Sequence, residues 1–237
     1  MTILSAEEWQ IVALSLRVSV VAMLGCLPLA FGLAWVLARR RVPGMILLDA
    51  VVHLPLVLPP VVTGWLLLIA FGAHGPLGRL LANTLGLTFM FRWTGAALAS
   101  AVMALPLMVR SIRLSLEAID IRLEDAARTL GAGRWHCFWT ITLPLAMPGL
   151  LAGLVLGFAR SIGEFGATIT FVASIPGETE TLPLAIFAAL QTPGGDNEVT
   201  RLAIVSVLLS LAALVASEVL VRRGPGGDDT TGRRHVL

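Results

Sequence analysis

Long runs of hydrophobic residues dominate the sequence, and polar residues are confined to the shorter segments between them. A helix that crosses the hydrocarbon core of a bilayer needs roughly 20 apolar residues, and the sequence predicts about five such spans. In chain order they cover residues 11–38, 45–72, 93–109, 143–175 and 202–221. A further apolar piece, Leu182–Leu190, is too brief to cross a bilayer, so we expect it to lie at the interface or to re-enter the membrane.

The composition agrees with a membrane protein. Of the 237 residues, 57% are hydrophobic and 14% are charged, whereas a soluble globular domain has about 45–50% apolar and about 25% charged residues. So much apolar surface cannot be buried in one water-soluble core, and the composition also excludes a disordered chain and a disulfide scaffold. We therefore expect an all-α fold, a polytopic bundle of about five membrane helices surrounded by lipid.

The residue types exclude several kinds of chemistry. All 17 basic residues are Arg, and without Lys the chain can form neither a P-loop phosphate site nor a Schiff base. The two cysteines, Cys26 and Cys137, lack the spacing of a redox or zinc motif, and the histidines lack metal-ligand spacing. We expect no bound metal or cofactor, and the net charge of +2 is too small to indicate a nucleic-acid partner.

The distribution of arginines predicts the orientation in the membrane. Most of them follow the first, third and fifth spans: Arg39, Arg40, Arg41, Arg110, Arg113, Arg122, Arg128, Arg134, Arg222, Arg223, Arg233 and Arg234. Positive charge accumulates on the cytoplasmic side, so we expect residues 1–10 outside and a disordered tail, 222–237, in the cytoplasm. Because the leader is acidic at Glu7 and Glu8, we expect it to be retained rather than cleaved as a signal.

The longest predicted cytoplasmic connection, residues 111–142, has its own helical pattern. Apolar residues from Ile119 to Leu130 recur at helical spacing and form one stripe, while Glu124 and Arg128 are expected to face elsewhere as an i,i+4 pair. Gly131 stands where a helix ends with a left-handed residue, and a second short helix is expected over 135–141. The pattern predicts a hairpin that projects from the membrane; an interfacial helix packed on its own bundle is the alternative.

The hairpin carries a motif that resembles the EAA loop of ABC importer permeases. Asp125, Ala126 and Ala127 are followed, at the family's spacing, by Gly131 and then by Ile141, Leu143 and Pro144. Asp125 stands where the family commonly has Glu, which keeps the charge on a shorter side chain. The resemblance implies an ABC transmembrane type-1 domain over residues 11–221. It also implies that the hairpin couples to a separate ATPase through Glu124, Asp125, Ala126, Ala127, Gly131, Ile141, Leu143 and Pro144.

The same resemblance implies the partners and the location. It implies a homodimer of this subunit, two cytoplasmic ATP-binding subunits that use ATP and Mg, and a periplasmic binding protein, all at a bacterial inner membrane. The chain itself would then be a transporter subunit and not an enzyme.

Other segments resemble the oxyanion branch of that family. Residues 53–64 and 160–168 are similar to its second-span and fourth-span motifs, and residues 175–179 with 191–195 are most similar to molybdate permeases. The resemblance extends from about residue 9 to residue 221 and implies molybdate import with a periplasmic molybdate-binding protein. Tungstate has nearly the same size and charge, and sulfate/thiosulfate permeases share the general plan, so both remain alternative substrates.

A tetrahedral dianion must cross the membrane without being held tightly, so we expect hydroxyl and backbone N–H groups along its path. The candidate side chains are Thr63, Ser161, Thr168 and Thr170. Pro55, Pro59 and Pro60 would free backbone groups in the second span, which is tolerated only beside protein or a water-filled cavity. Alternatively, these prolines kink a packed helix and the hydroxyls bond to their own backbone.

Two further features lie within the fourth span. Arg160 and Glu164 are intramembrane charges at i and i+4, and we expect them to act as an orienting pair rather than as ligands. Gly149, Gly153 and Gly157 form a small-residue ridge that allows close helix approach. We expect this ridge at a subunit interface that lines the path, with packing inside one subunit as the alternative.

Two other classes of protein are alternatives to the importer permease. A self-sufficient secondary transporter would more often show repeated halves and several buried titratable groups, whereas the sequence shows no evident repeat and one such ion pair. An intramembrane enzyme would need a nucleophile with a base, or a metal cluster, on facing spans. No such arrangement is evident in the sequence.

Overall fold

The computed structural model describes residues 4–39 and 43–222, which form eleven α-helices, one short π-helix and no strand. In chain order the elements are α1 (Ala6–Arg39), α2 (Met45–Val57), α3 (Pro60–Phe71), α4 (Pro76–Leu85), α5 (Trp93–Glu117), α6 (Ile121–Thr129), α7 (Arg134–Cys137), η1 (Phe138–Thr142), α8 (Leu143–Ile162), α9 (Gly166–Val172), α10 (Leu182–Leu190) and α11 (Asp196–Arg222). The all-α prediction is confirmed. Most of the predicted disordered tail, from residue 223 on, lies outside the described residues.

Four helical stretches of the described chain are long and apolar enough to cross a membrane: Ala6–Arg39, Trp93–Glu117, Arg134–Ile162 and Asp196–Ala216. The helices α2 and α3 pass the same test as a pair, but they bend by 116° at the break between them. Counting that pair as one span gives five, which agrees with the sequence prediction. The first helix begins at Ala6, so it already includes half of the segment predicted to precede the spans.

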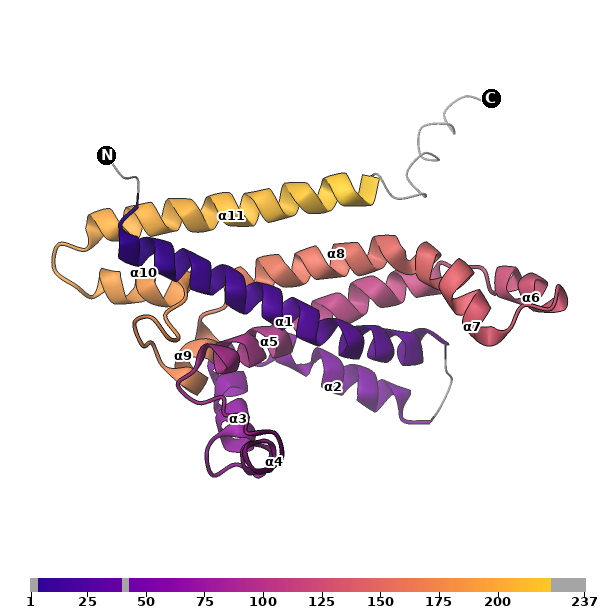
Figure 1. Ribbon diagram of the computed structural model, residues 1–237, viewed down its shortest axis with the longest axis horizontal. Helices are drawn as coiled ribbons and strands as arrows, with labels where there is room; N and C mark the ends of the chain where they lie inside the picture. The colour runs from indigo at the N-terminus through magenta and orange to yellow at the C-terminus, as the bar shows by residue number, and fades with distance from the viewer. Residues whose placement is uncertain (1–3, 40–42, 223–237) are drawn as a thin grey trace.

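The centre of the bundle is formed by α1, α5 and α8, which pack together along most of their length (Figure 1). Small residues make this packing close: Ala30 and Ala34 of α1 and Ala96 and Ala99 of α5 are fully buried. Within lipid, helices associate through such close packing rather than through the hydrophobic effect. The bundle core therefore depends on shape complementarity between small side chains.

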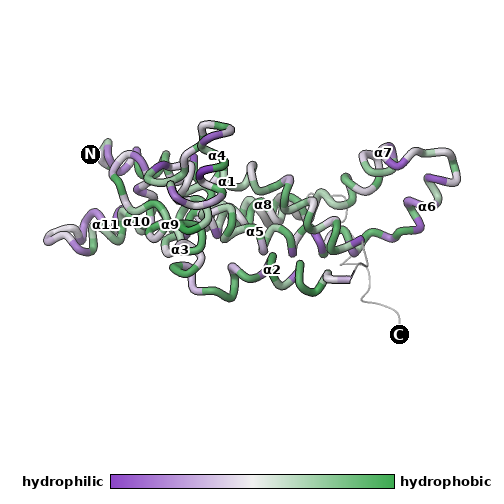
Figure 2. Tube along the Cα trace, turned by 90° about the horizontal axis from the view of Figure 1, so that it is seen from below, coloured by the Kyte–Doolittle hydropathy of each residue, from purple (hydrophilic) through white to green (hydrophobic). Residues whose placement is uncertain are grey.

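The molecule is elongated, and its two ends differ. The hairpin of α6 and α7 extends from one end, while the start of α1, α10 and the start of α11 lie at the other (Figure 1). The helices α3 and α4 project sideways from the bundle. Hydrophobic colour extends along α2, α5 and α8, whereas hydrophilic segments gather in α6 and near the N-terminal end (Figure 2).

Three predicted boundaries are corrected. The third span continues to Glu117 rather than ending at residue 109, because no helix breaker intervenes and Arg113 pairs with Glu117 at 2.7 Å. The short helix predicted over 135–141 is not separate, since α7, η1 and α8 run on as one helix with a π-turn between them. The fourth span, predicted to reach residue 175, instead breaks after Ile162, and α9 is a distinct helix.

Candidate functional site

The hairpin begins and ends with local backbone signals. The Asp120 side chain caps α6 by accepting a hydrogen bond from the backbone N–H of Arg122 at 2.9 Å, which satisfies one of the free donors at a helix start. After Leu130 the chain turns at Gly131, whose φ of +92° is in the left-handed region. The predicted glycine stop is confirmed, because a side chain at this φ would be strained.

Most of the apolar residues of the hairpin are exposed. Leu130 is 88% exposed and Trp135 is 77% exposed, and Ile121, Leu123 and Trp139 are exposed as well. Ile119 precedes α6 and does not belong to the helix. The alternative of an interfacial helix whose stripe packs on its own bundle is therefore not what the structure shows. An uncovered apolar surface of this kind is typical of a protein–protein contact.

Glu124 is the one buried side chain of α6. It faces the bundle while the apolar stripe is exposed, so it lies off the stripe as the spacing predicted. Its Oε1 accepts hydrogen bonds from Arg39 Nη2 at 2.8 Å and from Thr142 Oγ1 at 2.8 Å. The predicted partner Arg128 is also present, with its Nη2 3.7 Å from Oε2. Because a buried carboxylate is stable only when paired and hydrogen-bonded, these contacts fix α6 to the ends of α1 and η1.

Aromatic side chains strengthen the same attachment. The Phe138 ring lies 5.9 Å from that of Phe31 and 5.6 Å from that of Trp35, both on α1. Edge-to-face contacts of this kind stabilise a packed pair beyond the area that it buries. Sequence reasoning missed Arg39 and Phe138 as parts of the site, because their partners are distant in the chain.

The residues of the predicted coupling motif divide into two groups. Asp125 and Ala126 are exposed and Ala127 is half-buried, all on α6 near the exposed tip. The others lie where the hairpin returns toward the bundle, at the end of η1 and the start of α8: Ile141, Leu143 and Pro144. The motif residues therefore lie in two places, near the tip of the hairpin and where the chain re-enters the bundle. Glu124 attaches the base of the hairpin to α1 and η1.

A second arrangement joins the two broken spans. The break between α2 and α3 lies next to the break between α8 and α9, since a Cβ added at Gly166 would come within 2.7 Å of Pro60 Cβ. Likewise, a Cβ at Gly64 would come within 2.6 Å of the Ala167 carbonyl oxygen. Only glycine permits this approach of α3 to α9. The predicted proline-cut second span is thus a sharp bend packed against protein.

The four predicted path hydroxyls fall in two places. Thr63 of α3 and Thr168 of α9 are both buried, and Thr63 Oγ1 has no hydrogen-bond partner among the described residues. Thr170 bonds to its own helix, with its hydroxyl donating to the Gly166 carbonyl at 2.8 Å. Ser161 lies apart from them and donates to Ser19 Oγ of α1 at 3.0 Å.

The predicted pair of intramembrane charges spans the α8–α9 break. Arg160 Nη1 lies 2.6 Å from Glu164 Oε2, and Glu164 Oε1 accepts the Ala167 backbone N–H at 2.9 Å. Glu164 is buried, so the arginine and the helix start together compensate its charge. The carboxylate thereby fixes the direction in which α9 leaves the break.

The glycine ridge packs inside the subunit, which corrects the expectation of a subunit interface. A Cβ at Gly153 would meet the Met108 carbonyl at 3.3 Å, and one at Gly157 would meet Met23 Sδ at 2.6 Å. Gly149 faces Ser111 and Ser115 of α5 in the same way. The spacing correctly indicated close packing, but it could not identify which helix provides the contact.

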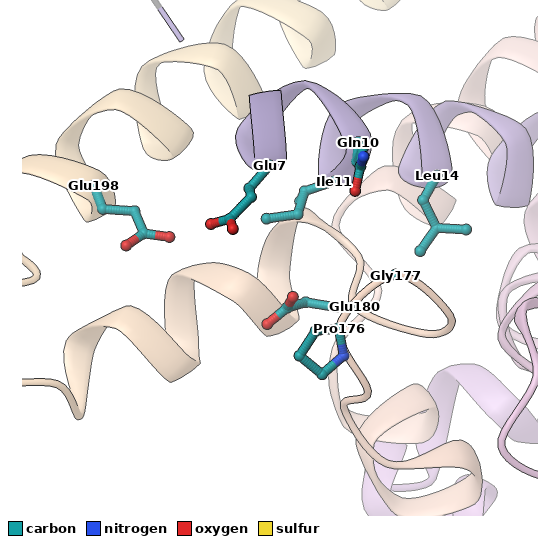
Figure 3. Close-up of a pocket in the computed structure, with 8 residues that line it drawn as sticks. All are labelled: Glu7, Gln10, Ile11, Leu14, Pro176, Gly177, Glu180 and Glu198. Atoms are coloured by element: carbon teal, nitrogen blue, oxygen red, sulfur yellow. The ribbon is translucent and has the colours of Figure 1, made fainter. Parts of the chain in front are cut away.

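An acidic cavity that the sequence did not indicate lies between the start of α1, the start of α11 and the loop that leads into α10 (Figure 3). These elements lie at the end opposite the hairpin (Figure 1). The cavity has a volume of about 640 Å³, and the carboxylates of Glu7, Glu180 and Glu198 surround it. Burial raises the pKa of Glu180, and the negative charges of Glu198 and Glu7 raise it further. Such a cavity repels anions, so it is a poor place to hold an oxyanion.

Comparison with known proteins identifies the family. The model described as "Binding-protein-dependent transport system inner membrane component" matches residues 27–223. The chain belongs to this family. One relative is the "Molybdenum transport system permease protein ModB" of Escherichia coli. It is 58% identical to this chain over 220 residues, which cover 93% of this chain and 96% of the relative. The resemblance to molybdate permeases is confirmed.

A second permease and a solved structure are also similar to this chain. The "Sulfate transport system permease protein CysT" of Escherichia coli is 41% identical over 187 residues, which is 78% of this chain and 66% of that protein. The fold is that of a bacterial ABC transporter "involved in the import of the acidic polysaccharide alginate", with a TM-score of 0.72, 19% identity, and coverage of 93% of this chain and 80% of that one.

Proposed function

We propose that this inner-membrane component is the permease subunit of an ATP-driven importer that carries molybdate into the cytoplasm, with ATP hydrolysis on a separate subunit. The observation that carries the coupling role is the hairpin: its tip is exposed and apolar, while its base is fixed by the buried Glu124. The identity of 58% to a molybdenum permease supports the substrate.

The hairpin can transmit motion because its base has two attachments. Through Glu124 it is bound to Arg39 at the end of α1 and to Thr142 at the end of η1, each at 2.8 Å. Docking of an ATPase on the tip would therefore displace α1 and α8 together. Those two helices also form the bundle core with α5, so a movement of the hairpin would reach the membrane part of the subunit.

We infer that the oxyanion passes beside the junction of α3 and α9. Two helix breaks meet there, which frees backbone groups, and the buried hydroxyls of Thr63 and Thr168 belong to the two helices that follow these breaks. The Thr63 hydroxyl, which has no partner among the described residues, is available as a donor. Arg160 is neutralised by Glu164 at 2.6 Å, so no fixed cation would trap the dianion.

The proposed assembly is the one that the resemblance to importer permeases implies. We propose two copies of this subunit, two cytoplasmic ATP-binding subunits and a periplasmic molybdate-binding protein. A structural relative with a TM-score of 0.72 was solved "in complex with alginate pentasaccharide-bound periplasmic protein", which supports a binding protein as the partner.

The proposed orientation places the hairpin in the cytoplasm and the N-terminus in the periplasm. The C-terminal ends of α1, which carries Arg39, and of α5, which carries Arg110 and Arg113, lie toward the hairpin, and the start of α1 lies at the opposite end (Figure 1). This separation agrees with the accumulation of positive charge on the cytoplasmic side.

Competition for uptake tests the proposed substrate. In cells that lack their own molybdate permease, the complete transporter should accumulate molybdate, and tungstate should compete because it has nearly the same size and charge. Sulfate in excess should compete far less. Uptake of sulfate with no effect of molybdate would contradict the substrate while leaving the permease role intact.

A further inference from the structure

An apolar groove lies on the outside of the bundle, between α1 and α5. It has a volume of about 420 Å³ and is lined mainly by apolar side chains of the two helices, among them Val21, Gly25, Leu29, Ala97, Ala101 and Leu105. Neither the oxyanion path nor the hairpin uses it.

Two rows of residues at a spacing of four shape this groove. Val21, Gly25 and Leu29 follow one another along one face of α1, and Ala97, Ala101 and Leu105 do so along α5. The rows lie side by side, since Cys26 Sγ is 3.6 Å from the Ala101 carbonyl oxygen and, nearer the start of both helices, Arg17 of α1 lies over Trp93 of α5. Glycine and alanine at the middle positions leave room for an occupant.

At the end of the groove nearer the N-terminus lie a cation and an aromatic ring, each four residues before the first member of its row. Arg17 precedes Val21 and Trp93 precedes Ala97, and the guanidinium carbon of Arg17 lies 3.8 Å from the centroid of the Trp93 ring. Arg17 is exposed. Tryptophan and arginine with an apolar stem are typical of the membrane–water interface.

The length of the groove fits one leaflet of a bilayer. From Arg17 to Leu29 the helix rises by about 18 Å at 1.5 Å per residue, and half of the hydrocarbon core is about 15 Å thick. With Arg17 at the level of the lipid headgroups, the apolar part of the groove therefore extends to about the middle of the membrane.

We propose that this groove is a binding site for an anionic phospholipid of the outer leaflet. One acyl chain lies between α1 and α5, and the phosphate pairs with Arg17 above Trp93. The cation at one end and the apolar walls along the rest match the two parts of such a lipid. A helix of a second copy of this chain would match the small residues but would not use the exposed cation.

Native mass spectrometry of the purified transporter complex tests the site with a matched pair of variants. Gly25→Leu fills the groove, and Gly32→Leu makes the same change on α1 outside it. A Cβ at either glycine meets nothing within 4 Å, so neither substitution disturbs the backbone. We expect Gly25→Leu to lower the amount of retained phosphatidylglycerol by roughly fivefold or more, and Gly32→Leu to leave it unchanged.

The surface variant Arg17→Gln separates the headgroup from the chain. We expect it to reduce the preference for phosphatidylglycerol over phosphatidylcholine roughly fivefold, while the complex still assembles. Retention and preference that are unchanged in both Gly25→Leu and Arg17→Gln would overturn the proposal. So would dissociation of the two permease copies by Gly25→Leu with lipid retention intact, since the groove would then hold the second copy. Neither result would bear on molybdate uptake.

Discussion

Glu124 is the residue whose surroundings explain how the hairpin can be both exposed and firmly attached. Its side chain is 9% exposed, it shares one oxygen between Arg39 and Thr142, and it lies on a helix whose other residues face outward or are half-buried. A paired charge in such a place fixes geometry, because removing one partner leaves the other buried and uncompensated.

Glu124→Gln should therefore destabilise the subunit by about 3 kcal/mol. This is the lower end of the range of about 3–5 kcal/mol found when one partner of a buried ion pair is removed. Thermal unfolding of the detergent-solubilised subunit measures this change. Asp125→Asn is the matched control on the same helix: its side chain is 63% exposed, so stability should change little, while ATP-dependent uptake should fall. Equal loss of stability in both variants would contradict the assignment of Glu124 to the base and Asp125 to the tip.

At the acidic cavity, the raised pKa of Glu180 leads to a prediction about pH. A carboxyl whose pKa is raised on folding contributes stability below the unfolded pKa of about 4.3, and this contribution is lost as the pH rises through the higher folded pKa. Glu180→Gln should therefore raise the unfolding temperature at pH 7, with a difference that shrinks as the pH is lowered toward 4. The exposed neighbour Glu178 provides the control: Glu178→Gln removes a carboxylate from the surface of the same loop, so the unfolding temperature should change little.

At the scale of elements, the sequence predicted what depends on periodicity and could not predict what depends on distant partners. The spans, the hairpin and the Gly131 turn follow from spacing and local backbone preference. The burial of Glu124 depends on Arg39, which is 85 residues away, and neither residue is unusual by itself. The break after Ile162 was missed because Arg160 and Glu164 fit an i,i+4 pair on one continuous helix and apolar residues resume after them.

The glycine ridge is a second case in which spacing predicts close packing but not the partner helix. Its packing inside the subunit leads to a prediction. Gly157→Leu should destabilise the isolated subunit by about 1–3 kcal/mol, the usual cost of overpacking, since an added Cβ lies 2.6 Å from Met23 Sδ and 3.0 Å from Met108 Cγ. Gly32→Leu on α1, where a Cβ meets nothing within 4 Å, should not. Thermal unfolding of the subunit without its partners distinguishes the two cases.

If Gly157→Leu left the isolated subunit as stable as the unmodified one and impaired only assembly, the ridge would belong to a subunit interface after all. The packing against α1 and α5 would then not describe the subunit in its complex.

At the scale of the whole molecule, the described chain is a membrane bundle from which the α6–α7 hairpin protrudes. The hairpin at one end carries exposed apolar side chains, and its base reaches two of the three core helices. The other end carries an acidic cavity that does not favour anions. The difference between the two ends fits a subunit that receives mechanical work at the hairpin, and it predicts that an oxyanion enters away from the acidic cavity.

Leu130→Asp should prevent docking of the ATPase without unfolding the subunit. Leu130 is 88% exposed, so an aspartate there costs little in the isolated chain, but it would place a charge in an apolar contact. Co-purification of the ATP-binding subunit should fall sharply, whereas the unfolding temperature should stay the same. Unchanged co-purification would show that the tip is not the docking surface.

The most direct test of the central claim is molybdate accumulation in proteoliposomes that contain this subunit with or without its ATP-binding partner. Accumulation is expected only when the partner, ATP and the molybdate-binding protein are all present. Accumulation by the purified subunit alone, without the partner and ATP, would contradict the account. The chain would then be a self-sufficient transporter, and the hairpin would not be needed to couple it to an ATPase.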